Sequence, residues 1–172
     1  MRCCGCGAEF GDEEGPVHRY MLSSPGCWAA YGQVLAREYQ DQAYYRLHRL
    51  SMDAYAVQHP GVDNAQARNS VGVHLSRLCL LLEMGWPMEQ ANAAMVEISA
   101  KKRSYPWLTP PEFMGERTVR DVLEAATPAE HEARVQAWAE SVWAAWSEHH
   151  ATVRGWVEEW RGGTVKGFFR EL

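Results

Sequence analysis

Three of the five cysteines in the chain, Cys3, Cys4 and Cys6, lie within four positions near the N-terminus. The fragment Cys3–Gly7, here called the knuckle, places two thiols at C-x2-C spacing, which suits chelation of one tetrahedral ion. Its glycines let the backbone turn tightly around that ion. Cys4 could replace Cys3 as a ligand, although Cys4-x-Cys6 is a poorer chelate than Cys3-x2-Cys6. The knuckle therefore indicates half of a metal site.

Two residues downstream could complete the coordination shell. His18 and Cys27 extend the pattern to C-x2-C-x11-H-x8-C, a set of three sulfurs and one nitrogen that is typical of structural Zn²⁺. The intervening residues 7–16 contain glycines and acidic residues without a helical period, so a metal would be needed to order them. We therefore predict a structural zinc site formed by Cys3, Cys6, His18 and Cys27.

Other interpretations of the cysteines remain open at this point. An odd cysteine count without a secretion signal argues against a disulfide framework and in favour of reduced thiols or a metal. The N-terminal cysteines could be free thiols on a frayed terminus, or ligands of a catalytic zinc with an open position. A thioredoxin-type redox pair would need a preceding strand and a following long helix, which the pattern lacks. Cys79 lies in an apolar helical run and is expected to be buried.

Several histidines fall on or beside apolar helix faces. One hypothesis is that His48 or His59 converges with His74 and His149 from three helices, to bind a second metal or supply a general base. The alternative is that each imidazole lies at the edge of the core, hydrogen-bonded to a nearby polar group. His131, in the first turn of the last helix, is expected to face solvent. The catalytic candidates are therefore His59, His74 and His149.

The elements that must position these residues are helical throughout. Apolar spacing, capping residues and prolines predict an all-α fold, a bundle of about five to six helices. The predicted helices cover residues 25–38, 41–58, 65–84, 118–125 and 128–160, and a further helix begins at Pro87. Gly162-Gly163 is expected to end the last helix. The expected organisation is a zinc-binding knuckle and loop (1–27) packed on the bundle (28–161), followed by a tail (162–172).

Composition limits the classes of partner. The chain has 172 residues and a formal net charge of −5, which argues against nucleic acid and anionic membrane surfaces as partners. The longest apolar run, residues 78–82, is far too short to span a bilayer, and no apolar signal segment follows Met1. We expect a soluble cytoplasmic protein, monomeric or homodimeric, with a small-molecule ligand or a protein partner. The eight tryptophans could build either the core or a binding cavity.

Several motifs in the chain resemble those of a family of small bacterial proteins known only as a domain of unknown function. The motifs are CCGCG, HRYMLSSPGCW, DAYAVQHPG, VGVHLSRLCLLLE and HHATVRGW. The resemblance implies that Cys3, Cys6, His18 and Cys27 are motif positions, and it places His48, Asp53, His59 and His74 in the helical motifs.

A weaker similarity is to the damage-inducible (DinB-like) helical-bundle superfamily, whose members bind a metal through three histidines and include thiol-dependent transferases. In that superfamily two of the histidines lie four residues apart on the last helix, whereas this chain offers adjacent His149 and His150.

Two functional hypotheses follow. The first is a non-enzymatic helical protein with a structural zinc, acting through a partner or as a small-molecule binder. The second is a metal-dependent enzyme of the transferase, hydrolase or isomerase type that uses the inward histidines. We favour the first, because a four-ligand site is evident in the sequence and a nucleophile–base pair is not.

Overall fold

The computed structural model describes the backbone of residues 1–100 and 104–168, and the side chains of that part up to Gly162. This part of the chain is helical and contains no β-sheet, so the all-α prediction is confirmed. The α-helices are α1 (Pro25–Gln40), α2 (Gln42–Tyr45), α3 (His48–Gln58), α4 (Ala65–Leu78), α5 (Met88–Ala100), α6 (Val119–Leu123), α7 (Pro128–Ala145) and α8 (His150–Phe168). A π-helical turn, η1 (Cys79–Glu83), continues α4, and a 3₁₀ turn, η2 (Ser147–His149), separates α7 from α8.

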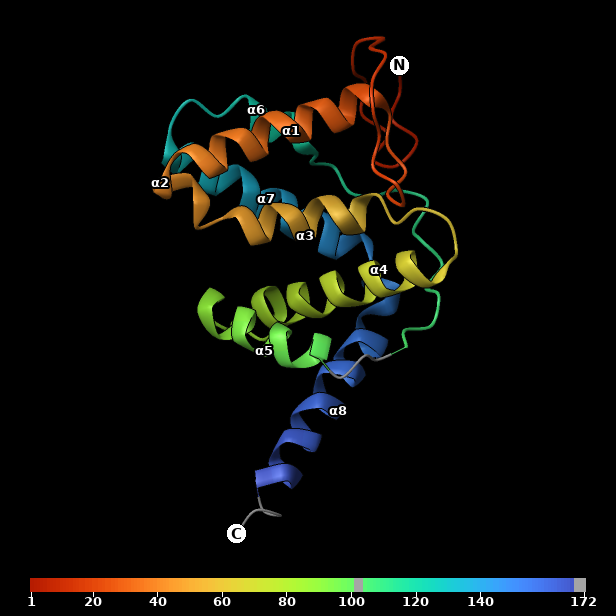
Figure 1. The fold of residues 1–172 in the computed structure, drawn as a ribbon, viewed down its shortest axis with the longest axis vertical. Helices are drawn as coiled ribbons and strands as arrows, with labels where there is room; N and C mark the ends of the chain where they lie inside the picture. Colours follow the sequence, from red (N-terminus) through yellow and green to blue (C-terminus); the bar gives the residue numbers. More distant parts are fainter. Residues whose placement is uncertain (101–103, 169–172) are drawn as a thin grey trace.

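The helices stack in layers along the long axis of the molecule (Figure 1). Helix α1 packs against α6 at one end, and α3 lies between α7 and α4. Helix α5 packs on α4, and α8 extends away from the bundle at the opposite end. The non-helical residues 1–24 run beside the start of α1 and the end of α3. The N-terminal segment therefore packs against one edge of the bundle.

Helix starts follow from side chains that cap free backbone amides. The Ser24 hydroxyl accepts a hydrogen bond from the Cys27 amide at 3.2 Å, and Pro25 occupies the first turn of α1. Thr127 caps α7 in the same way, by accepting from the Glu130 amide. The Glu130 carboxylate binds the amide of Ala126, the residue before the cap, at 2.8 Å. These caps explain why both helices begin where the sequence predicts.

The helix predicted over residues 41–58 is divided into α2 and α3. The Asp41 carboxylate accepts from the Ala43 amide at 2.8 Å and starts α2, which ends after one turn. The Leu47 amide then donates to the Tyr44 carbonyl at 3.0 Å, closing a turn before α3 begins. This turn places Leu47 in the core together with the first residue of α3.

The helix predicted over residues 128–160 is also divided. At Trp146 the amide is shared between the Val142 and Trp143 carbonyls, and the 3₁₀ turn η2 follows. Helix α8 continues through Gly162 and Gly163, so these glycines do not end the helix as predicted. Residues 169–172 of the predicted tail lie outside the described residues. No helix in the described part is both long enough and apolar enough to cross a membrane.

The core contains Trp138 of α7 and Trp146, the residue that follows this helix. Trp138 and Trp146 are fully buried, which supports the interpretation of the tryptophans as core residues. The Trp138 indole donates to the Gln58 side-chain oxygen at 2.9 Å, and the Trp146 indole donates to the Val57 carbonyl at 3.1 Å. Both bonds hold the last residues of α3, because an indole N–H buried without an acceptor would be costly.

Candidate metal centre

Four buried side chains meet where the N-terminal segment contacts the bundle. The Sγ atoms of Cys3, Cys6 and Cys27 and a ring nitrogen of His59 all lie within 4.8 Å of one another. His59 Nε2 is 3.4 Å from Cys27 Sγ and 3.5 Å from Cys3 Sγ, and the sulfurs of Cys6 and Cys27 are 3.8 Å apart. This group, here called the Cys3His cluster, could hold a metal ion.

The distances match those of a tetrahedral zinc site. With Zn–S bonds of about 2.3 Å and a Zn–N bond of about 2.05 Å, tetrahedral angles place sulfurs about 3.8 Å from each other and about 3.6 Å from the nitrogen. The Cys3His cluster has a sulfur pair at 3.8 Å and nitrogen–sulfur pairs at 3.4 and 3.5 Å. These three pairs are therefore close to the spacing that a four-coordinate ion requires, and the other pairs lie within 4.8 Å.

The knuckle positions two of the sulfurs. The Gly7 amide donates to the Cys3 carbonyl at 3.0 Å, and Gly7 has a φ of 75°, which closes the turn in a conformation that glycine adopts readily. Gly5 lies against the His59 ring, and a Cβ atom there would be only 2.3 Å from the ring carbon Cδ2. The glycines are thus required for the turn and for the approach of the knuckle to His59.

Helices position the other two ligands. Cys27 lies in the first turn of α1, where the Ser24 cap fixes its backbone. His59 follows the last residue of α3, and its Nδ1–H donates to the Tyr55 carbonyl at 2.8 Å. Because a carbonyl can only accept, this bond leaves the lone pair of Nε2 directed at the sulfurs, as in most histidine metal ligands. The Tyr55 ring stacks on the His59 ring and fixes its orientation.

The three thiols compete for ionisation when no cation neutralises them. Hydrogen bonds from Cys27 and Cys6 lower the pKa of Cys3 far below its ordinary value. The Cys27 thiol donates to the sulfurs of Cys3 and Cys6, and these two bonds, of which the one to Cys3 has the larger effect, raise the pKa of Cys27. For Cys6, a bond with Cys27 favours the thiolate, but the neighbouring Cys3 and burial raise its pKa to about 12. A divalent cation at the centre would let all three sulfurs ionise together.

His18, the predicted fourth ligand, does not belong to the Cys3His cluster, and His59 takes its place. The His18 ring packs against Tyr20 and Trp28, and its Nδ1 accepts from the Tyr20 amide at 3.5 Å. His18 is close to the cysteines along the chain, which is why the sequence favours it. His59 is separated from Cys27 by helices α1, α2 and α3. Of the two neighbouring cysteines in the knuckle, Cys3 is in the cluster and Cys4 is exposed.

The inward histidines do not converge on a second site among the described residues. His59 belongs to the Cys3His cluster, and His74 Nδ1 lies 2.7 Å from Asp53, whose carboxylate also binds Arg77. His149 Nε2 lies 2.8 Å from the Thr109 carbonyl on the surface, because the turn η2 moves it off the core face. His74 and His149 therefore each have a separate hydrogen-bond partner, as the alternative to convergence expects, and His59 alone belongs to the Cys3His cluster.

A buried carboxylate with two imidazoles forms a separate polar cluster. Glu38 of α1 is fully buried and binds His131 Nε2 at 3.1 Å and His48 Nδ1 at 3.2 Å. The Ser51 hydroxyl also donates to it at 2.8 Å. Burial alone would raise the pKa of Glu38, but the bonds from His131, His48 and Ser51 together lower it. His131 is therefore a core residue, and its predicted exposure is wrong.

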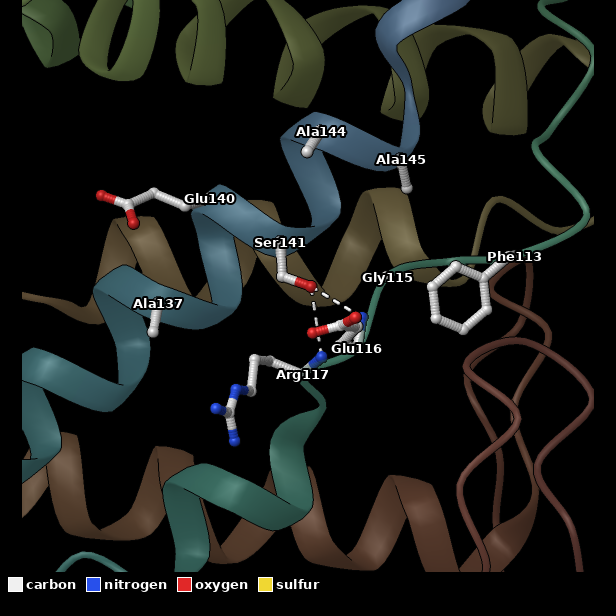
Figure 2. Close-up of a pocket in the computed structure, with 9 residues that line it drawn as sticks. All are labelled: Phe113, Gly115, Glu116, Arg117, Ala137, Glu140, Ser141, Ala144 and Ala145. Carbon is white, nitrogen blue, oxygen red and sulfur yellow. Dashed lines mark hydrogen bonds between the residues drawn. The ribbon is translucent and has the colours of Figure 1, made fainter.

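A surface pocket lies between α7 and the loop that precedes α6 (Figure 2). The pocket has a volume of about 490 Å³, and Phe113 stands at its edge with 65 % of its surface exposed. Ser141 on α7 accepts hydrogen bonds from the backbone amides of Glu116 and Arg117, at 2.7 and 3.2 Å, and so attaches the loop to the helix. The surface that lines this pocket is largely apolar.

Comparisons with known proteins place the chain in a family. A family model described as a family of unknown function (DUF5946) matches residues 1–147. No curated protein and no solved structure is detectably similar to the chain. The match contains all four residues of the Cys3His cluster and ends before α8. The chain therefore belongs to the DUF5946 family.

Proposed function

We propose that Cys3, Cys6, Cys27 and His59 bind one zinc ion. The observation that carries this proposal is the set of four donors, which lie within 4.8 Å of one another and of which three pairs are near tetrahedral spacing. Three thiolates and one imidazole are soft and borderline donors, which select Zn²⁺ over Mg²⁺ or Ca²⁺. The Nδ1–H bond of His59 to a carbonyl supports it further, because metal-binding histidines are oriented in this way.

The role of this zinc is structural. Four protein ligands complete a tetrahedral shell and leave no open position for a substrate. The ion joins the knuckle to the first turn of α1 and to the residue after α3, three parts that are distant in the sequence. Residues 1–24 contain no helix. Their regular backbone pairing is an isolated β-bridge between Arg2 and Glu9. Metal binding would therefore order this segment on the bundle.

The fourth ligand can be tested by comparing His18, which the sequence favours, with His59, which lies beside the three thiols in the structure. Zinc content of the purified full-length chain is measured for His59→Ala and His18→Ala. We expect one zinc per chain in the unchanged protein and in His18→Ala, and weakened or absent zinc in His59→Ala. Cys4→Ser is a matched control for Cys3→Ser, because Cys4 is adjacent but exposed. Zinc lost in His18→Ala and retained in His59→Ala would refute the assignment.

A second candidate function, binding of a small cationic molecule with an apolar body, is favoured by the pocket beside Phe113. Ala137, Ala144 and Ala145 supply the apolar wall, and the Ser141 oxygen is already engaged by two amides. Arg117 also lines the pocket, but its guanidinium is paired with Asp121 at 3.1 Å. Two carboxylates of the lining, Glu116 and Glu140, form no ion pair within the described part of the chain. Apolar pockets with a few charged groups at the rim are typical ligand sites.

Two probes of the same shape and opposite charge test this binding. Benzylamine and benzoate are titrated into the isotope-labelled protein while amide signals are followed by NMR. We expect benzylamine to shift the signals of residues 113–117 and benzoate to leave them unchanged. Filling the pocket with Ala144→Leu is expected to remove the shifts. Equal responses to the two probes, or none to either, would contradict the proposal.

A further inference from the structure

One of the four metal ligands lines a cleft that opens on the surface. The cleft has a volume of about 590 Å³ and lies between the knuckle and residues 112–120. Among the four ligands, Cys6 is the one that lines it. Cys6 is also the most exposed of the three cysteine residues of the cluster, at 9 %, compared with 2 % for Cys3 and 0 % for Cys27. A small reagent can therefore reach the cluster through Cys6.

The walls of this cleft are fixed by hydrogen bonds. The Arg120 guanidinium donates to the Glu9 carbonyl at 3.0 Å and ties the strand-like residues after the knuckle to α6. Arg2 donates to the Gly7 carbonyl at 3.0 Å on the knuckle itself. A molecule of hydrogen peroxide needs the space of about two waters, roughly 60 Å³. The cleft therefore has room for a peroxide molecule beside Cys6.

A second sulfur lies in position to react with an oxidised Cys6. Cys27 Sγ is 3.8 Å from Cys6 Sγ, and a disulfide requires closure to about 2.05 Å. Cys27 is held by the first turn of α1. Cys6 lies between two glycines, Gly5 and Gly7, in the knuckle. Closure can therefore be made by movement of the knuckle toward the helix. Cys3 is held by the Ser24 amide, which donates to its sulfur at 3.5 Å.

We propose that Cys6 is a site of oxidation by peroxides, and that a Cys6–Cys27 disulfide then forms and releases the metal. This inference rests on the proposed zinc site and describes its regulation. The Cys6 sulfur attacks one peroxide oxygen, the O–O bond breaks and hydroxide leaves, which gives a sulfenic acid. The Cys27 sulfur attacks the Cys6 sulfur, the S–O bond breaks and a second hydroxide leaves. Two thiolates, one H₂O₂ and two protons thus give one disulfide and two waters.

Release of the ion follows from the loss of two ligands. Disulfide sulfurs carry no charge and are poor zinc ligands, because the thiolate is the form that binds metal. Cys3 and His59 alone would then have to hold the ion. The knuckle would then no longer be joined to His59, the residue after α3, and would separate from the bundle at that point. Oxidation would therefore change the surface of the protein around the knuckle.

The test treats the zinc-loaded, full-length protein with hydrogen peroxide in the presence of a chromogenic zinc chelator. Disulfides are mapped by mass spectrometry after thiol alkylation. We expect one zinc to be released for each Cys6–Cys27 disulfide formed, a trappable sulfenic acid on Cys6 first, and buried Cys79 to remain reduced. Cys4→Ser should release zinc at the same rate as the unchanged chain. A first disulfide that contains Cys3 or Cys4, or zinc release without a disulfide, would overturn the proposal.

A matched pair of ligand variants provides an independent check. Cys6→His and Cys3→His each keep four zinc ligands of accepted type. Cys3→His should still release zinc on oxidation, and Cys6→His should resist it. If these variants do not load zinc, the mapping in the unchanged chain decides alone. The zinc content of untreated protein separates the two proposals: protein without zinc contradicts the metal site, and zinc that peroxide leaves bound contradicts only the oxidation.

Discussion

Replacement of Gln58 tests how the bundle positions the metal centre. Gln58 is the last residue of α3, directly before His59, and its side chain is fully buried. Its amide nitrogen donates to the Met114 carbonyl at 2.9 Å and the Arg117 carbonyl at 2.8 Å. Its oxygen accepts from the Trp138 indole at 2.9 Å. One side chain thus links α3, α7 and the loop before α6.

The variant Gln58→Met keeps the length and volume of the side chain and removes all three hydrogen bonds. Each buried group left without a partner costs about 1–3 kcal/mol. The Trp138 indole and the Met114 carbonyl have no access to water, because their bonds to Gln58 are buried. The Arg117 carbonyl is partly buried and loses less. The expected loss in the free energy of unfolding is therefore about 2–6 kcal/mol, a large part of the stability of a typical domain.

Urea denaturation of the zinc-loaded protein measures this loss, and competition with a chelator measures the zinc affinity. We expect both to fall, because the end of α3 carries His59. The exposed Gln66→Met on α4 is a matched control and should leave both unchanged. A loss of less than about 1 kcal/mol in Gln58→Met would refute the reasoning, since solvated or rearranged partners would then replace the three bonds.

Three further predictions concern the knuckle and the buried carboxylate. Gly5→Ala should weaken zinc binding in a chelator competition, because the added Cβ would lie 2.3 Å from the His59 ring. Gly11→Ala is the control and should leave zinc binding unchanged, because its Cβ would have its nearest neighbour at 3.9 Å. Removal of zinc by a chelator should raise amide hydrogen exchange in residues 1–24 and leave α3 protected, since the ion orders the N-terminal segment; equal loss of protection in both would contradict this. The lowered pKa of Glu38 should stabilise the fold at neutral pH, and this stability should be lost as pH falls below the ordinary value of 4.5 and through the lower folded value. Glu38→Gln should flatten this acid dependence of the unfolding free energy, and an unchanged acid slope would rule Glu38 out as its source.

The Cys3His cluster also changes how the N-terminal segment relates to the rest of the chain. A zinc knuckle with all four ligands in residues 1–27 would be a module that could be removed as a unit. In the structure one ligand, His59, comes from the bundle and is stacked on Tyr55 inside it. The proposed metal binding would therefore be coupled to the packing of α3, and variants in the core should alter metal affinity.

Local signals in the sequence were sufficient for most of the fold. Ser24, Thr127 and the prolines that follow them mark the starts of α1 and α7, because a capping side chain acts on amides only two or three residues away. The breaks at Leu47 and at η2 could not be predicted in this way. Apolar residues continue at helical spacing through both breaks, and the turns depend on packing between helices that are distant in the sequence.

The sequence by itself predicted that the chain is helical and that the knuckle and Cys27 bring their thiols together, since C-x2-C spacing constrains a chelate within a few residues. Only the tertiary structure decided which imidazole lies beside the three thiols. His18 and His59 are both plausible by residue type, but α3 returns its end to the start of α1, where Trp138 and Trp146 hold it in place. Which imidazole reaches the sulfurs is thus a consequence of helix packing, and packing is not encoded in the spacing of the ligands.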